Sequence, residues 1–172
     1  MLNGPVRSVR QRLGWETLEI GLWLNQTVVF DPAVASLQED LDRLGVIVRG
    51  CNGFPQTSFH APVVKRSVYR PHWGENDRLW YTKRLAEVLV SIGHGPVREI
   101  STVPIGHQEL SSGILPVAIK NLLDLVDFLS ALEDESGIRV VVDLEPEPDC
   151  LLECSSDVVE LFDRLGDAPC LL

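Results

Sequence analysis

Segments with helically spaced apolar residues alternate along this chain with short, continuous apolar runs. Five segments repeat apolar residues every three or four positions, which predicts helices at 5–13, 31–45, 77–92, 116–132 and 156–165. Between them lie four runs of strand-forming residues, at 17–24, 46–52, 97–103 and 138–145. Helix and strand therefore alternate strictly, which is typical of an α/β fold built from parallel βα units.

Helix ends and one long irregular stretch refine this pattern. Asp31 before Pro32 predicts a capped helix start, Gly45 a helix end, and Ser155 or Ser156 the cap of the last helix. From Gly53 to about residue 76 neither periodicity is present, so we expect a long loop. Loops of that length within a compact domain tend to be functional.

The segment 138–148, IRVVVDLEPEP, is an apolar run that ends in carboxylates. Pro146 and Pro148 lack the N–H that would extend a strand, so the strand is expected to stop at Glu145. In parallel α/β sheets, ligands bind at the carboxyl ends of the strands, which makes Glu145 the first candidate for chemistry. The other interpretation is an acidic turn that is polar only because it is solvated.

Composition limits the classes of function. A length of 172 residues, 45% of them hydrophobic, fits one globular domain spanning 1–172. A formal net charge of -10 argues against nucleic acid as a partner and leaves metals and small polar molecules. The N-terminus does not resemble a signal peptide and no segment approaches a membrane span, so we expect a cytoplasmic protein.

Cysteine spacing and glycine motifs limit the kinds of site that this chain can form. The four cysteines form no CxxC pair, which favours reduced thiols, and Cys150 with Cys154 would supply only two ligands of a zinc site. No GxGxxG or GxxxxGK[ST] motif follows any predicted strand, so nucleotide binding is not indicated. Periodicity alone fits both a flavodoxin-like open sheet and part of a (β/α)-barrel.

A spaced series of residues runs through the centre of the chain. It comprises Asn52-Gly53-Phe54-Pro55, Phe59-His60, Val64-Lys65, Val68-Tyr69, Pro71, Trp73 and Tyr81-Thr82, and continues in Ile100-Ser101-Thr102-Val103-Pro104 and Leu144-Glu145-Pro146-Glu147-Pro148. The series resembles the metabolite-traffic proteins of ebo-type operons, within the xylose-isomerase-like (sugar phosphate isomerase/epimerase) TIM-barrel superfamily. This resemblance implies a partial (β/α)8 barrel. The four predicted strands would correspond to its second to fifth strands, with the first and last strands missing.

The same resemblance implies a metal site at the mouth of the barrel. In the superfamily a divalent metal (Mn, Zn or Mg) is held by acids and a histidine from the last four strands. Glu145 matches the first of these ligands, with Glu147 the alternative if the register shifts by two. The remaining ligands would lie beyond Leu172. Because a hard cation needs several ligands, the isolated chain is expected to hold no tightly bound metal.

Four more residues are candidates for binding a substrate. His60 in the long loop could contact a ligand or anchor the loop, and Lys65 could neutralise an anionic ligand or be an ordinary solvated cation. Asn52 could hydrogen-bond a polar ligand or form a turn before Gly53. His107 follows the third strand. His72 and His94 are expected in surface turns, and Tyr69 and Trp73 could stack on a ligand or pin the loop.

Two functions of different classes therefore remain open. The first is a truncated xylose-isomerase-like barrel that acts on or traffics a small polar metabolite and is inactive as an isolated chain. The second is a non-catalytic binding or assembly module, whose open sheet edges pair with a second copy or another chain. Whether any reaction is catalysed, and on which substrate, is left open by these residues.

Overall fold

The computed structural model describes residues 3–56, 67–110 and 113–172. Four parallel strands form one sheet in the order β1-β2-β3-β4, so each strand lies beside the strand that follows it along the chain. The strands are β1 (Leu18–Trp23), β2 (Val46–Asn52), β3 (Val97–Thr102) and β4 (Arg139–Leu144). The helices are α1 (Asn3–Leu13), α2 (Gln26–Val29), α3 (Leu37–Leu44), α4 (Asn76–Ile92), α5 (Leu115–Ser136) and α6 (Ser155–Leu165). The predicted alternation of helix and strand is confirmed.

Residues 170–172 extend the sheet beyond β4. Leu171 pairs in parallel with Val142, and Leu172 O accepts a hydrogen bond of 2.7 Å from Leu144 N. This short parallel pairing, an isolated bridge at Leu171, was not predicted by the sequence pattern. The sheet is thus an arc of a (β/α)-barrel, with β1 at one edge and residues 170–172 at the other.

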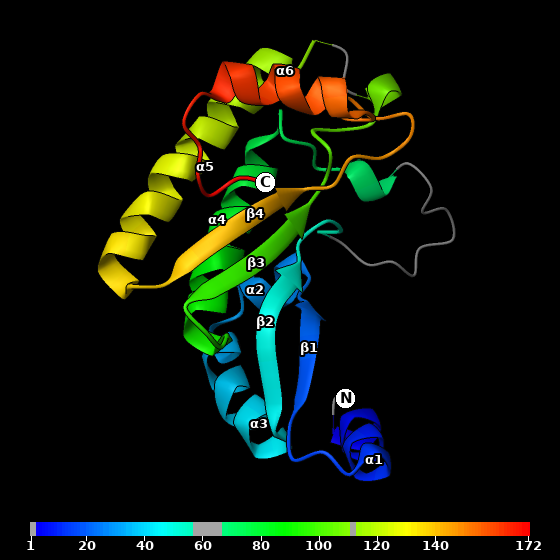
Figure 1. Cartoon of the computed structure of the whole chain (residues 1–172), viewed down its shortest axis with the longest axis vertical. Helices are drawn as coiled ribbons and strands as arrows, with labels where there is room; N and C mark the ends of the chain where they lie inside the picture. Colours follow the sequence, from blue (N-terminus) through cyan, green and yellow to red (C-terminus); the bar gives the residue numbers. More distant parts are fainter. Residues whose placement is uncertain (1–2, 57–66, 111–112) are drawn as a thin grey trace.

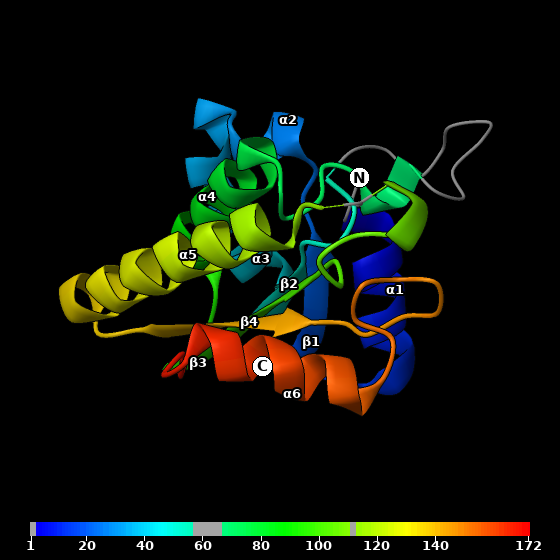
Figure 2. The same cartoon turned by 90° about the horizontal axis from the view of Figure 1, so that it is seen from above.

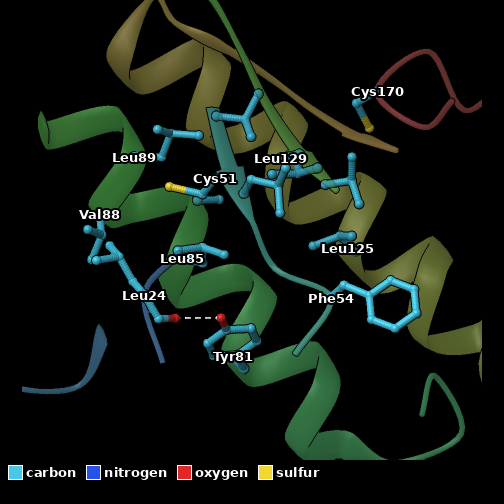
Figure 3. Packing of buried hydrophobic residues seen from close by; sticks show 14 of the residues in the cluster. Leu24, Cys51, Phe54, Tyr81, Leu85, Val88, Leu89, Leu125, Leu129 and Cys170 are labelled. Carbon is cyan, nitrogen blue, oxygen red and sulfur yellow. Dashed lines mark hydrogen bonds between the residues drawn. The ribbon is translucent and has the colours of Figure 1, made fainter. Parts of the chain in front are cut away.

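Side chains on one face of the sheet form the main core. Val48, Ile100 and Val142 are completely buried against the helices, and Leu22, Cys51 and Leu144 lie in the same cluster. Figure 1 shows the four strands in front of α4, and Figure 2 shows α4 and α5 together on one side of the strands. Close packing of Leu85, Leu89, Leu125 and Leu129 on this side is seen in Figure 3. Burial of apolar surface against α4 and α5 is therefore the main stabilising term of the fold.

Helix ends largely follow the predicted signals. The Asp31 carboxylate accepts a hydrogen bond from Ala33 N (2.8 Å), and Gly45 ends α3 with a left-handed φ of 62°. The single predicted helix at 31–45 is instead a 3-10 helix (Pro32–Ser36) followed by α3, because the proline-capped start tightens the first turn. The predicted serine cap of α6 is wrong. Cys154 is the cap, and its N–H donates to the Asp157 carboxylate at 2.9 Å.

None of the helices within the described ranges is both long and apolar enough to cross a membrane. All four cysteines are free thiols, and three of them (Cys51, Cys150 and Cys170) are buried.

Candidate functional site

The carboxyl ends of β2 and β4 meet at one pocket. Its volume is about 250 Å³, and it is lined by Asn52, Phe54, Pro55, Val68, Glu145 and Glu147. Asn52, Glu145 and Glu147, three candidates identified from the sequence, therefore share one cavity although 93 positions separate Asn52 from Glu145. Parallel strands bring their carboxyl ends to the same edge of the sheet, which explains the convergence.

Glu145 lies immediately after β4 and is half-buried. Its backbone N–H donates to Thr102 O at 3.1 Å, so the strand pairing with β3 still holds its backbone in place. Pro146 then ends the pairing because it has no N–H to donate. The carboxylate is thereby presented from a rigid strand end, which confirms the predicted end of the strand.

Glu147 lines the same pocket and is held by a tyrosine from the loop before α4. Tyr69 Oη donates a hydrogen bond of 2.6 Å to Glu147 Oε2, and Glu147 N donates to Leu152 O at 3.0 Å. Burial and this hydrogen bond raise the pKa of Tyr69, so its phenol stays protonated and acts as the donor. Glu145 and Glu147 thus both face the pocket, one free to meet a ligand and one already bound to Tyr69.

Asn52 ends β2 and takes part in the turn that follows. Its side-chain oxygen accepts a hydrogen bond from Phe54 N at 2.9 Å, which is the turn arrangement expected before Gly53. This bond leaves the side-chain NH₂ as the group able to donate to a ligand. Both interpretations of Asn52 are therefore compatible: one end of the amide shapes the turn and the other faces the pocket.

Arg78 of α4 holds this turn in place through hydrogen bonds, a role that the sequence pattern did not predict. The guanidinium is completely buried and donates to Gly53 O (2.6 Å), Phe54 O (3.0 Å) and Pro71 O (2.7 Å). Burial lowers its pKa to about 10, so it remains charged at neutral pH. One buried cation thus fixes the wall of the pocket formed by Phe54 and Pro55 to the segment around Pro71.

His107 does not line the pocket. Its ring lies 5.5 Å from the ring of Tyr69, between centroids, and its Nδ1 accepts a hydrogen bond from Glu109 N at 3.3 Å. It is buried, and its backbone pairs with Cys150. His107 therefore packs behind Tyr69 and reaches the pocket only through that residue. His60 and Lys65, the other two predicted ligand-binding residues, lie outside the described residues.

The expectation that His72 lies in a surface turn is wrong. Its side chain is buried, with Nε2 at 3.3 Å from Glu75 Oε1, and burial lowers its pKa. The neighbouring Trp73 is completely buried, and its carbonyl accepts a hydrogen bond from Asn121 Nδ2 at 2.8 Å. These residues anchor the loop beneath the pocket, so the packing interpretation of Trp73 holds and no ligand can stack on it.

Negative charge extends from the pocket down the exposed face of the sheet. Burial, and then the charges of Glu99 and Glu145, raise the pKa of the Asp143 carboxyl. Glu145, Asp143 and Glu99 come from the two neighbouring strands β4 and β3. The site therefore favours ligands that donate hydrogen bonds or carry positive charge over anionic ones.

A complete metal site is not formed by the described part of the chain. No group of three or more His, Cys, Asp or Glu side chains there is arranged to hold a metal ion. Glu145 and Glu147 offer two carboxylates, one of which is engaged by Tyr69. Cys150 is buried while Cys154 caps α6 at the surface, so they form no zinc pair. The two carboxylates could supply part of the coordination sphere of a divalent cation, which needs more ligands than these residues provide.

No family model matches this chain, and no curated protein sequence matches it significantly. Solved structures, however, match it over 96% of its length. One is an IolI protein with a bound zinc atom (14% identity, 54% of that chain, TM-score 0.55). Another is a xylose isomerase domain protein from Planctomyces limnophilus (16%, 55%, 0.59), and a third is 3-keto-D-glucoside 4-epimerase from E. coli (15%, 59%, 0.53).

These similarities show that the chain shares part of the fold of these proteins, in agreement with the partial α/β barrel that the sequence resemblance implied. The chain spans little more than half the length of each of these proteins. At 14–16% identity the likeness concerns the fold and carries no residue roles with it.

Proposed function

We propose that this chain contributes the Glu145 edge of a binding site for a small polyhydroxylated metabolite in a sugar isomerase- or epimerase-type barrel. The observation that carries the proposal is the convergence of Asn52, Glu145 and Glu147 on one pocket at the carboxyl edge of the sheet. Carboxylates and an amide NH₂ suit ligand hydroxyls, while Phe54, Pro55 and Val68 suit the C–H face of a sugar ring.

Glu145 would act as hydrogen-bond acceptor and as one ligand of a divalent metal in an assembled barrel. A Mn, Zn or Mg ion there would supply Lewis-acid polarisation of a substrate oxygen. This chain's own residues do the rest: Asn52 orients a hydroxyl, and Tyr69 fixes the position of Glu147. The zinc atom in the IolI structure supports a metal in relatives of this fold. By itself the chain would bind metal weakly and convert no substrate.

The proposal is tested with the purified chain by ligand-observed NMR. We expect weak, saturable binding of a keto sugar or pentose at millimolar concentration, reduced at least fivefold by Asn52→Ala and by Glu145→Gln. Glu153→Gln, an exposed carboxamide change outside the pocket, is the matched control and should bind as the wild type does. Equal binding by all four proteins would contradict the proposal.

Calorimetry with MnCl₂ and ZnCl₂ tests the incomplete metal site separately. We expect a dissociation constant above about 100 μM, because few carboxylates give weak sites. Tight stoichiometric binding that Glu145→Ala abolishes would show instead that this chain holds a complete site.

A second function, assembly through the open sheet, is favoured by a specific observation. β1 pairs only with β2, and residues 170–172 pair only with β4, within the part of the chain that the structure describes. The β1 edge therefore has backbone groups available to a further strand, whereas the amides of Leu171 and Leu172 already donate to Ala168 O and Val142 O. The two functions are compatible, because completing the barrel would also complete the site around Glu145.

A further inference from the structure

The segment 67–75, which leads into α4, carries one wall of the pocket and also contains a buried histidine. Val68 lines the pocket and Tyr69 donates a hydrogen bond to Glu147, so the position of this segment decides the shape of the pocket. His72 lies further along the same segment, and its side chain is only 6% exposed. A change at this buried ring would therefore be felt at the pocket wall.

One carboxylate oxygen holds His72 in place. Glu75 Oε1 lies 3.3 Å from His72 Nε2, accepts a hydrogen bond of 3.2 Å from His72 N, and lies 3.4 Å from Arg70 Nε. Because Nε2 faces a carboxylate, the neutral ring keeps its proton on Nε2 and donates through it. Trp73 N fixes the segment further by donating to Ile105 O at 2.9 Å. The neutral histidine is thus part of the hydrogen bonding that holds the segment.

The other ring nitrogen of His72, Nδ1, is buried and has no hydrogen-bond partner among the described residues. It lies against Gly74, where a Cβ atom would be 3.2 Å from Nδ1 and 2.8 Å from Ile114 Cβ. Protonation would place an N–H group on Nδ1, and this group would be a buried donor without an acceptor. The ring can therefore be protonated only at a cost while the segment stays in place.

The charges around the ring also oppose its protonation on balance. Among the described residues, Glu75 and Arg70 of the same segment and Arg78 of α4 act on the ring, while Ile114, just before α5, is apolar. Burial is the largest effect, and together with the two arginines it lowers the pKa of His72. Glu75 acts in the opposite direction, but its oxygen is shared with Arg70. The folded segment therefore binds a proton more weakly than a solvated histidine does.

We propose that His72 is a pH-sensitive anchor, which holds segment 67–75 at the pocket while its ring is neutral and releases the segment when the ring is protonated in mildly acidic solution. An open segment exposes the ring to water, where a histidine has a pKa of about 6.5, so the open form gains population as the pH falls. Release would displace Val68 and Tyr69 together and leave Glu147 without its hydrogen bond. The conformational step needs no ligand, and only its effect on binding rests on the function proposed above.

The step is measured by amide hydrogen exchange of the purified chain at pH 7.5 and at pH 5.5, with each rate corrected for the intrinsic rate at that pH. We expect the amides of Arg70 and Trp73, which donate to Ser67 O and Ile105 O, to lose between threefold and tenfold protection at pH 5.5. Tenfold is about the upper limit that one histidine of ordinary pKa allows over this range. Amides of β4 are the internal reference and should change less than twofold.

His72→Gln is the variant that isolates the ring, because its amide keeps a donor for Glu75 but does not titrate. Protection of segment 67–75 in this variant should agree within twofold at the two pH values. His94→Gln is the matched control. It removes a histidine that accepts a hydrogen bond from Val48 N and does not line the pocket, and it should respond to pH as the wild type does.

NMR of the imidazole nitrogens in the wild-type chain gives an independent measurement if His72→Gln does not fold by circular dichroism. At pH 7.5 the proton of His72 should reside on Nε2 alone, and the ring should gain its second proton only as the segment loses protection. A ring that titrates like a solvated histidine while Arg70 and Trp73 keep their protection would overturn the inference.

Two exchange results would also overturn it. One is a loss of protection below threefold in the wild type, and the other is an equal loss in wild type and in folded His72→Gln. Sugar affinity is measured on the same samples by ligand-observed NMR. A segment that opens at pH 5.5 while no sugar binds at either pH would contradict the function proposed for Glu145 and support the anchor, so the two failures are distinguishable.

Discussion

The two faces of the sheet have opposite chemistry although the same strands build both. Along β4, Val140 and Val142 are buried against the helices, while Asp143 between Val142 and Leu144 points to the other face. One face gains its stability from packed apolar side chains. The other face carries the half-buried carboxyl of Asp143 next to the buried Val141, and this carboxyl contributes little to the stability of the chain alone. Adjacent residues on one strand therefore serve different purposes, since one packs in the core and the next faces the other side of the sheet.

The largest expected effect on stability comes from placing a carboxylate on the buried face of β4, and the reverse change at the next residue is its control. Val142→Asp would bury an unpaired carboxylate against α5 and should lower the free energy of unfolding by about 4 kcal/mol or more. Asp143→Val, the adjacent reverse change, should alter it by only about 0.5 kcal/mol. Urea unfolding followed by circular dichroism measures both. Similar losses in the two variants would break the distinction between the faces.

Arg78 connects the covered side to the pocket and should give the next largest effect. Arg78→Met keeps the length of the side chain but leaves three buried carbonyls without their donor, at a cost of about 3 kcal/mol. Thermal unfolding of this variant is compared with Arg84→Met, whose side chain is partly exposed and donates to one carbonyl. If Arg78→Met loses no more stability than Arg84→Met, the three hydrogen bonds of Arg78 do not hold the pocket wall in place.

Tyr69→Phe tests the hydrogen bond that holds Glu147 beside the pocket. Removing the hydroxyl should cost about 1 kcal/mol of stability and weaken sugar binding, since Glu147 is then free to move. Phe54 contacts the same ring, so the apolar packing of residue 69 is preserved in the variant. Unchanged ligand affinity in the NMR titration would show that ligand binding does not depend on the hydrogen bond between Tyr69 and Glu147.

The smallest effect is the pH dependence that Asp143 contributes. Its pKa is raised in the folded chain, so the folded state binds the proton more tightly than the unfolded state does. Stability should therefore decrease as pH rises from the ordinary aspartate pKa through the raised one. Asp143→Asn should remove that decrease and leave the chain slightly more stable at pH 7. A wild-type stability that instead increases through this window, relative to the Asn variant, would contradict the assigned direction.

Much of the fold followed from local patterns. The β-branched run before Glu145 and the helical spacing around Leu85 and Leu122 specify their elements, because burial on one side requires those periods. Residues 170–172 escaped prediction because three residues show no periodicity. The Cys154 cap escaped because cysteine is not a usual capping residue.

The site was predictable only where a residue ends a strand. Asn52 and Glu145 were identified because strand ends converge in a parallel sheet, and the pocket brings them together. Arg78 was not identified, and Tyr69 was considered only for stacking or for pinning the loop, because the bonds from Arg78 to Gly53 O and from Tyr69 to Glu147 join residues more than 20 positions apart. His72 was misassigned because a histidine between proline and tryptophan carries no local sign of burial.

The most direct test of the account follows amide hydrogen exchange in the wild-type chain at micromolar and at millimolar protein concentration. Assembly through the sheet edge predicts that amides of β1 gain at least tenfold protection at the higher concentration, while those of Leu171 and Leu172, which already donate to Ala168 O and Val142 O, change little. Amides of β2 and β3, already paired on both sides, should change little. Protection gained on the outer surfaces of α4 and α5 instead, or gained nowhere, would contradict the proposal that β1 pairs with a further strand.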